Sequence, residues 1–406
     1  MPSLYVHVPF CQSKCAYCSF YSVPLGKILD NQKNGQIFNE SSELIPQYLR
    51  GMAQEIKLRF TEAPSGVSTL FLGGGTPTVL NPRELEELLK TIHRNYIFVP
   101  EKAEMTVEAN PGTLTLDKVA ILHNYGINRI SLGVQSFNNQ ILKRIGRIHT
   151  AEDISLGIKI IRKAGIENLN LDLIFGLPGQ TMSDWQDTLK QAVACSPEHL
   201  SLYALTLEED TPLGRKYLTL TQNLETNYPN DDSRLPLPDD DFQADMYEWA
   251  VNYLQGKGYK HYEISNFAKE GFECLHNQAY WQGEDYLGLG PGAVSCLRGV
   301  RTKNTEDLAK YSKMILAGEK AFDPLGTEVL TKEQLITEYM MLGLRTTKGI
   351  DLKKFAGKFK VEVQDIYGQI LANYIDREIL ILVDGRLRIN EIYFFVANSI
   401  LQNFVI

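Results

Sequence analysis

The chain has 406 residues, of which 44% are hydrophobic and 22% are charged, and its formal net charge at pH 7 is −8. This composition predicts a folded protein with more than one domain, because single hydrophobic cores stop growing at about 250–300 residues. The acidic balance excludes a generally basic binder of nucleic acid or anionic membranes. No apolar run reaches the roughly 18 residues of a membrane span, and the first ten residues do not resemble a signal peptide, so we expect a cytoplasmic protein without a transmembrane segment.

Short segments that are rich in β-branched and aliphatic residues alternate with longer segments of helical periodicity. The six strand candidates are residues 4–8, 68–72, 104–108, 128–133, 168–174 and 198–204. Residues 81–84, Asn-Pro-Arg-Glu, predict the start of a helix, with an N-cap, a proline at the first helical position and a glutamate three residues after the cap. The alternation predicts parallel strands joined by helices, in an open sheet or in a full or partial barrel.

Two polar stretches, residues 23–42 and 218–241, interrupt the alternation and are interpreted as surface loops. After the second stretch, Phe242, Met246, Trp249 or Ala250, and Tyr253 recur at helical spacing. Residues 259–264 are a further strand candidate.

From about residue 326 the sequence predicts a compact helical region that ends in a hairpin around Asp384-Gly385, a dipeptide typical of type I′ turns. Helices followed by a hairpin indicate a winged-helix-like module. Because this region has nearly equal numbers of basic and acidic residues, we expect it to serve packing or docking and not nucleic-acid binding. The predicted domains are 1–217, 218–325 and 326–406.

Three of the six cysteines, Cys11, Cys15 and Cys18, lie in one short loop directly after the first strand candidate. Thiolates are the ligands that iron–sulfur clusters select, and three of them can each bind one iron of a cubane, which leaves the fourth iron without a local cysteine. The alternatives are three unrelated thiols or a structural zinc site, which needs four ligands that usually come as separated pairs. The spacing favours a [4Fe-4S] cluster.

Polar residues and glycines also occur where the other strand candidates end. These are the LGGGTP segment at 72–77, Glu108, Gln135, Asp172, and Tyr203 with Ala204. Parallel barrels bind their ligands at the carboxyl ends of the strands, so this distribution predicts an active-site rim. Any one of these residues alone has an ordinary interpretation as a cap or turn residue.

The combination resembles the radical S-adenosylmethionine (SAM) superfamily, whose hallmark is the CxxxCxxC loop, here with Tyr17 before the last cysteine. The resemblance implies an α/β fold with a partial (β/α)6 TIM-like radical SAM barrel and a smaller C-terminal helical, winged-helix-like domain. It also implies that the amino and carboxylate groups of SAM chelate the open iron of the cluster, and that the LGGGTP segment lies at the methionine end of SAM.

Six segments indicate which families within this superfamily the chain resembles: LYVHVPFC, FLGGGTPT, VEANPGT, LGVQSFN, LDLIFGLPGQ and EYMMLGLR. Together they resemble oxygen-independent coproporphyrinogen III oxidase and its close relatives, the HemW haem chaperones. The SAM contacts that this resemblance implies are Tyr5, Gly74, Gly75, Thr76, Glu108, Gln135, Arg147 and Asp172. Arg147 would pair its guanidinium with the SAM carboxylate, and its alternative interpretation is a solvated charge at a helix end.

Two features depart from the oxidase pattern and match the chaperones. Phe20 stands where the oxidase has a fourth cysteine, and only ten residues precede the cluster loop, where the oxidase has a substantial extension. We therefore expect a protein that binds haem and delivers it to an acceptor haemoprotein, such as a respiratory-chain component, rather than an enzyme. The alternative function is radical SAM oxidative decarboxylation of coproporphyrinogen III. The sequence leaves open whether the cluster or haem promotes a homodimer.

His276 begins an HNxxYW segment that resembles the one linked to haem binding in the chaperones. A histidine there would ligate the iron while the flanking aromatic rings cover the porphyrin. The alternative is a hydrogen-bonded histidine packed beside aromatic residues. Val294 stands where many relatives have another histidine, and Cys274 is a weaker candidate for contact with haem. Cys195, Cys274 and Cys296 show no ligand spacing and are interpreted as ordinary thiols.

Overall fold

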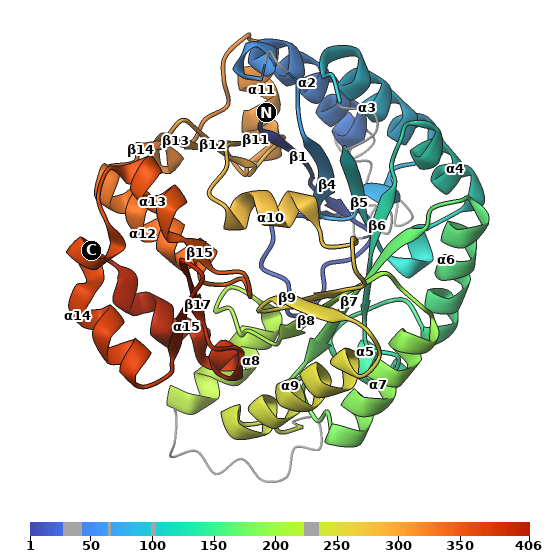
Figure 1. Ribbon diagram of the computed structural model, residues 1–406. Coiled ribbons are helices and arrows are strands. Elements are labelled where there is room, and N and C mark those ends of the chain that lie inside the picture. Colours follow the sequence, from blue (N-terminus) through green and yellow to red (C-terminus); the bar gives the residue numbers. More distant parts are fainter. Residues whose placement is uncertain (27–42, 64–65, 99–102, 223–234) are drawn as a thin grey trace.

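The computed structural model describes residues 1–26, 43–63, 66–98, 103–222 and 235–406, with the side chains of 219–222 left out (Figure 1). Its main feature is a curved 12-stranded sheet in the order β14-β13-β12-β11-β1-β4-β5-β6-β7-β8-β10-β9. Among the described residues, no helix is both long and apolar enough to cross a membrane.

Six parallel strands form the centre of the sheet, and they are the six that the sequence predicts. Their bounds are β1 (Ser3–Val8), β4 (Thr69–Gly74), β5 (Glu104–Ala109), β6 (Arg129–Gln135), β7 (Asn168–Phe175) and β8 (His199–Ala204). Each strand pairs in parallel with the next along the chain. The predicted α/β class and partial (β/α)6 barrel are confirmed.

The helices between these strands cover the outer side of the curved sheet (Figure 1). They are α2 (Leu44–Arg59), α3 (Pro82–Asn95), α4 (Leu116–Asn124), α6 (Ala151–Lys163) and α7 (Met182–Ala194), with the short α5 (Asn139–Arg144) following β6. Helix α3 begins with the predicted capping box, in which Asn81 and Glu84 each accept a hydrogen bond from the other's backbone N–H. Its apolar residues recur at helical spacing and are buried against the sheet, which fixes its orientation.

Short strands extend the sheet at both edges. On one side β10 (Asn266–Ala268) and β9 (Lys260–Glu263) follow β8 in antiparallel fashion, and β9 confirms the strand predicted at 259–264. On the other side β11 (Tyr286–Leu289) runs parallel to β1, followed by antiparallel β12 (Val294–Leu297), β13 (Val300–Lys303) and β14 (Glu328–Val329). The sequence did not predict β10 to β14, and they widen the partial barrel.

The two predicted loops are only partly described. Residues 27–42 and 223–234 lie outside the described residues, while β3 (Val23–Pro24) pairs with β2 (Phe10–Cys11). The ends of the predicted loop 218–241 are helical, because α8 (Pro212–Gln222) and α9 (Asp240–Gln255) extend into it. The buried face of α9 consists of Met246, Tyr247, Ala250 and Leu254, whereas Phe242, Trp249 and Tyr253 are half-buried.

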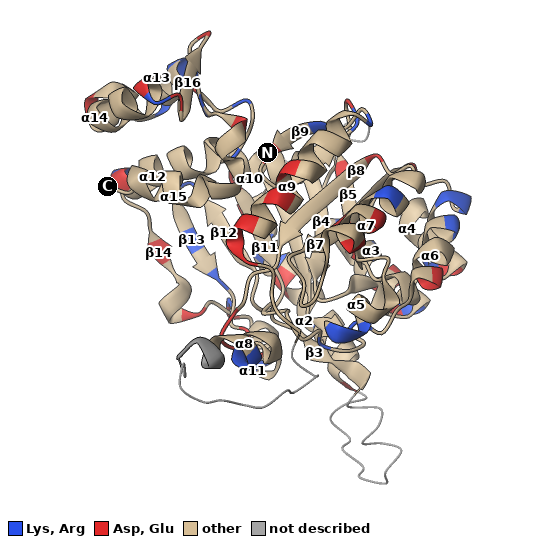
Figure 2. Cartoon of the chain, turned by 90° about the horizontal axis from the view of Figure 1, so that it is seen from below, with Lys and Arg blue, Asp and Glu red and all other residues tan. Residues whose placement is uncertain are grey.

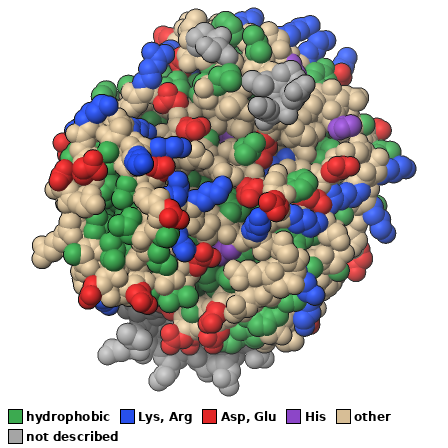
Figure 3. Space-filling view, in the orientation of Figure 1, with side chains coloured by type: hydrophobic (Ala, Val, Ile, Leu, Met, Phe, Trp, Pro, Cys, Tyr) green, Lys and Arg blue, Asp and Glu red, His purple; other side chains and the backbone are tan. Residues whose placement is uncertain are grey.

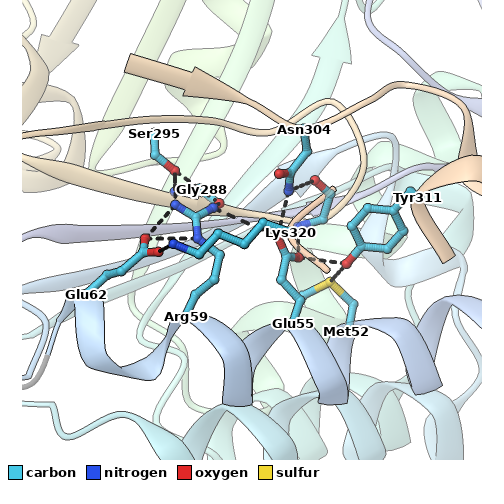
Figure 4. A network of polar contacts seen from close by, with 10 residues as sticks. Met52, Glu55, Arg59, Glu62, Gly288, Ser295, Asn304, Tyr311 and Lys320 are labelled. Carbon is cyan, nitrogen blue, oxygen red and sulfur yellow. Dashed lines mark hydrogen bonds and ion pairs between the residues drawn. The ribbon is translucent and has the colours of Figure 1, made fainter. Parts of the chain in front are cut away.

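A buried network of polar contacts joins α2 to the β11–β13 extension (Figure 4). The Glu55 carboxylate accepts hydrogen bonds from the Tyr311 hydroxyl (2.6 Å), the Asn304 amide (2.6 Å) and the Gly290 N–H (2.7 Å). Arg59 donates to the Ser295 hydroxyl at 3.0 Å and to the Glu62 carboxylate at 2.7 Å. Because a buried charge needs such partners, this network ties the extension to the barrel.

The C-terminal domain has the helix–strand–helix–helix–strand–strand order of a winged helix, as the sequence predicts. Its elements are α12 (Lys332–Gly343), β15 (Ile350–Asp351), α13 (Leu352–Phe359), α14 (Val363–Asp376), β16 (Leu380–Val383) and β17 (Arg386–Ile389). Asp384 and Gly385 both have positive φ angles, 51° and 73°, which confirms the type I′ turn. After the hairpin come α15 (Ala397–Leu401) and a short 3-10 helix (Gln402–Phe404).

This domain occupies the gap between the two edges of the curved sheet (Figure 1). At one edge, Arg301 of β13 pairs with Glu338 of α12 at 2.5 Å, and at the other the Thr347 N–H donates to the Tyr262 carbonyl at 3.1 Å. Helix α10 (Leu275–Trp281) lies across the inside of the ring, and α11 (Leu308–Leu316) packs on α2. The domain therefore closes what the partial barrel leaves open.

The outer surface carries charges of both signs. Acidic residues lie along α9, while α6 carries both basic and acidic residues (Figure 2). Hydrophobic side chains gather over the C-terminal domain on the face shown in Figure 3.

Candidate functional site

The CxxxCxxC loop lies at the carboxyl ends of the parallel strands and is fixed by backbone hydrogen bonds. Within the loop, the Ala16 N–H donates to the Ile145 carbonyl at 3.0 Å, and the Ala16 carbonyl accepts from Leu213 at 2.8 Å. Cys11, Cys15 and Cys18 all line one cavity of about 530 Å³. The loop therefore presents all three thiols to one side.

The geometry of these thiols suits a cluster better than a single ion. Across the described residues, no three Cys, His, Asp or Glu side chains converge on a point that could hold one metal ion. A cubane makes a different demand, because each cysteine binds a different iron. Three thiols around a cavity, with no fourth at hand, fit that donor set, and burial raises the pKa of Cys11 and Cys18, so that a bound metal would have to displace their protons.

Seven of the eight residues predicted to contact SAM line the same cavity: Gly74, Gly75, Thr76, Glu108, Gln135, Arg147 and Asp172. They come from the ends of β4, β5, β6 and β7 and from the loop after α5. The exception is Tyr5, whose hydroxyl lies 3.0 Å from His7 Nδ1 and whose ring stacks on Phe71. Tyr5 lies outside the lining of this cavity, and its contact with SAM stays a prediction.

The turn at the end of β4 requires glycines, because the Phe10 backbone and the His7 ring approach it closely. A Cβ atom at Gly75 would lie 2.5 Å from the Phe10 carbonyl oxygen, and one at Gly74 would lie 2.4 Å from the His7 ring. Gly74 also has a φ of 103°, which side chains disfavour. Thr76 follows at once, and its hydroxyl lies 3.7 Å from the Cys11 sulfur, so the turn and the cysteine loop are in direct contact.

Arg147 links the cysteine loop to the rim of the barrel. Its Nη1 lies 3.4 Å from the Cys15 sulfur, and its Nη2 donates to the Asn110 side-chain oxygen at 2.7 Å and to the Gly133 carbonyl. Its Nε is buried and has no partner among the described residues. Arg147 is thus not a solvated charge at a helix end, and one of its donors is left for a ligand.

Two buried carboxyl groups, Glu108 and Asp172, face this cavity. Burial and the neighbouring Asp172 raise the pKa of Glu108 to about 8, even though the Gly74 N–H donates to its carboxylate at 3.0 Å. Burial also raises the pKa of Asp172, whose oxygens accept hydrogen bonds from Ser131 and Asn170 at 2.8 Å each. A cationic ligand in this cavity would therefore favour the ionised forms of both groups.

The end of β6 departs from regular strand geometry at Gln135. This residue has a φ of 66°, and the pairing with β7 shifts register between Gly133 and Gln135. Such left-handed conformations are costly for residues other than glycine and occur preferentially at functional sites. The irregularity turns the Gln135 side chain into the cavity lining.

His276 lies at the start of α10 and is buried, with an exposed fraction of 2%. Its Nδ1 lies 2.8 Å from the Thr69 hydroxyl and its Nε2 lies 3.2 Å from the Tyr280 hydroxyl. Burial lowers the pKa of His276 to about 3, so the ring is neutral at physiological pH. Both nitrogens are engaged, which matches the alternative of a hydrogen-bonded histidine packed beside aromatic rings, and iron ligation would require one of these bonds to break.

Some residues of the site were not assigned from the sequence. Asn110 accepts a hydrogen bond from Arg147 and donates one to the Thr76 hydroxyl at 2.9 Å. Ser131 and Asn170 each donate a hydrogen bond to Asp172. Asn110 lies inside the quoted VEANPGT segment, so its position two residues after Glu108 at a strand end was a usable signal. Ser131 and Asn170 lie within strands, where the sequence gives no such signal.

Comparison with known proteins agrees with this geometry. Residues 5–192 match the model of the radical SAM superfamily, and residues 330–391 match that of the HemN C-terminal domain. The heme chaperone HemW of Lactococcus lactis subsp. lactis (strain IL1403) is 35% identical over 405 residues, which cover 100% of this chain and 97% of the relative. This chain belongs to the HemW family.

Further members of the HemW family match at similar levels. The heme chaperone HemW of Bacillus subtilis (strain 168) is 35% identical over 94% of this chain and 93% of its own length. Among solved structures, coproporphyrinogen III oxidase (HemN) from Escherichia coli, a radical SAM enzyme, superposes with a TM-score of 0.80 at 24% identity. That match covers 100% of this chain and 90% of the oxidase, and it shows that the HemW-family chain and the oxidase share their fold.

Proposed function

We propose that this chain is a haem chaperone, which binds haem and passes it to an acceptor haemoprotein, and that it carries a [4Fe-4S] cluster with a SAM site. The observation that supports this proposal most is the match, over essentially the full length of both chains, to relatives named as heme chaperones. Phe20 also supports the proposal. Its exposed side chain lines the cavity of the three cysteines, here called the cysteine cavity, and it cannot supply the thiol that the oxidase has at this position.

In this proposal some residues of the cysteine cavity hold the cluster and others bind SAM. Cys11, Cys15 and Cys18 would hold the cluster, which, when bound, supplies the electron for reductive cleavage of SAM. Gly74 and Gly75 would present their backbone to the methionine end of SAM, and Arg147 would offer a guanidinium to its carboxylate. All of these groups face the cavity described above.

The carboxyl groups would respond to the charge of SAM. Glu108, with a pKa of about 8, is mostly protonated at neutral pH. The ammonium and sulfonium charges of SAM favour the carboxylate form, so Glu108 would lose its proton as the ligand binds. Gln135, Ser131 and Asn170 complete the polar surface around Asp172.

The decisive experiment is a haem transfer assay with anaerobically reconstituted protein. We expect stoichiometric haem binding, followed by transfer to an added apo-haemoprotein, as monitored by absorbance. The same preparation is incubated with coproporphyrinogen III, a reductant and SAM. Robust formation of protoporphyrinogen would overturn the proposal in favour of the oxidase, and so would a failure of the protein to bind haem at all.

A further inference from the structure

A second and larger cavity, of about 940 Å³, lies between the barrel extension and the C-terminal domain. One wall comes from α10 and the β11–β13 strands and the other from α12, and the lining is mainly apolar and aromatic. The volume is at the upper end of the range of about 300–1,000 Å³ for small-molecule sites. Tyr203, at the end of β8, lines both this cavity and the cysteine cavity.

Strand β12 gives this cavity a reactive side chain. Successive residues of a strand face opposite sides, and Ser295 points into the buried Glu55–Arg59 network of Figure 4. The next residue, Cys296, consequently faces the other way and lines the cavity. Its thiol is half-buried and takes no part in the network behind the strand.

Aromatic rings make up much of the rest of the wall. The rings of Tyr280 and Tyr286 lie 4.7 Å apart between centroids, and the Arg345 guanidinium carbon lies 5.3 Å from the centre of the Trp281 ring. The indole N–H of Trp281 and the Nε of Arg345 are buried, and neither has a hydrogen-bond partner among the described residues. Buried donors without partners are costly, and here they point to a missing acceptor.

Charged side chains of both signs line the cavity: Arg298, Arg301, Arg345 and Lys358, and Glu263, Glu284, Asp285 and Glu338. The Arg301 guanidinium already has partners within the protein, because it donates to the Glu328 and Glu338 carboxylates at 2.7 and 2.5 Å. Arg298, by contrast, is exposed at the rim. Arg298 and Arg345 are therefore the guanidinium groups that an acidic ligand would meet there.

We propose that this cavity holds haem, with Cys296 as the ligand of the iron; the inference rests on the proposed chaperone function. A flat apolar macrocycle with two carboxylates at one edge matches an aromatic-lined cavity whose lining includes the Arg298 and Arg345 guanidinium groups. The side chains that ligate haem iron are His, Cys, Met and Tyr. No described histidine lines the cavity, whereas Cys296, Met341 and four tyrosines do, and among these Cys296 alone offers a thiolate. As the Fe–S bond forms, the thiol S–H bond breaks and its proton passes to solvent.

The test compares haem affinity and spectra of anaerobically reconstituted full-length variants. Leu335→Trp/Leu342→Trp places two indoles in the cavity from one face of α12, and Leu316→Trp/Leu325→Trp places them at exposed positions as a matched control. We expect the cavity variant to lose haem affinity by at least tenfold while it retains cluster iron and a normal unfolding transition, and the control to bind haem as the wild type does. Unchanged haem affinity in the cavity variant would overturn the site.

The Cys296→Ala variant tests the ligand. Thiolate ligation predicts a red-shifted Soret band for the ferrous carbon monoxide complex of the wild type, which Cys296→Ala loses while Cys195→Ala keeps it. The same spectrum in wild type and Cys296→Ala would overturn the assignment of Cys296. Failure of the proposed function is a different result, since the wild type itself would then bind no haem.

Discussion

The two cavities of this protein are built in opposite ways. The cysteine cavity is the more polar of the two and is formed at the ends of strands that follow one another along the chain. The larger cavity is apolar and exists only because the C-terminal domain packs against strands of the barrel extension. Chemistry that depends on a few reactive groups is thus encoded locally, whereas room for a large apolar ligand arises from the docking of distant segments.

The largest expected effect tests whether the two cavities are independent. Replacing Cys11, Cys15 and Cys18 by Ala should abolish cluster reconstitution, because no other described cysteine lines that cavity. Haem stoichiometry should stay the same, since the second cavity keeps all of its walls. Iron and sulfide analysis together with a haem titration would measure both, with Cys195→Ala as the control. Loss of haem binding along with the cluster would mean that the two sites are one functional unit.

The Glu55–Arg59 network should support the larger cavity in particular, because it lies directly behind β12. Arg59→Met leaves the buried Glu55 carboxylate without its cation, and breaking a buried ion pair from one side costs about 3–5 kcal/mol of stability. Denaturant unfolding would measure this change. Arg50→Met removes an exposed pair with Glu43 and should change the free energy of unfolding by less than about 0.5 kcal/mol. Equal effects of the two changes would contradict the structural role of the network.

In the cysteine cavity, Arg147 is the cationic counterpart of the two carboxyl groups. Arg147→Met should weaken SAM binding to the reconstituted protein by about 10- to 100-fold, which corresponds to the loss of a charged hydrogen bond of about 1.5–3 kcal/mol. Isothermal titration would measure the affinity. Lys143→Met, at an exposed position of α5, is the matched control. Haem binding in the other cavity should not respond to either change.

The smallest expected effect concerns His276, one residue before Asn277 in the lining of the larger cavity. Its folded-state pKa of about 3 is below the unfolded value of 6.5, so its contribution to stability is complete above pH 6.5 and decreases as the pH falls. Between pH 7 and pH 5 the wild type should therefore lose about 2 kcal/mol more stability than His276→Gln. Unfolding curves at the two pH values would show this difference. Haem binding that survives in His276→Gln would separate this structural role from iron ligation.

The sequence was sufficient for the local part of the structure. Regular alternation and capping signals predicted the six central strands, and the cysteine spacing predicted which loop faces the rim. The β10–β14 strands were missed because each has only two to four residues and their partners are distant in sequence, as for Tyr286, which pairs with Ser3.

The surroundings of individual residues were not predictable for a similar reason. The sequence left open whether His276 is a ligand or a hydrogen-bonded histidine, because the Thr69 hydroxyl that engages its Nδ1 lies 207 positions earlier in the chain. The contact of the Tyr5 hydroxyl with His7 gave no signal in the sequence either. Cys296 showed no ligand spacing, and only the tertiary structure shows the cavity that it lines together with α12. Partners that tertiary structure alone brings together are invisible to patterns along the chain.

Tyr203 lines both cavities, so the two proposed occupants would share one residue of their walls. A movement of Tyr203 on occupation of one cavity would then alter the shape of the other. Linkage is reciprocal: whatever factor haem imposed on the affinity for SAM, SAM would impose on the affinity for haem. A cofactor that is usually considered only for its radical chemistry would in that case also act on the release of a cargo.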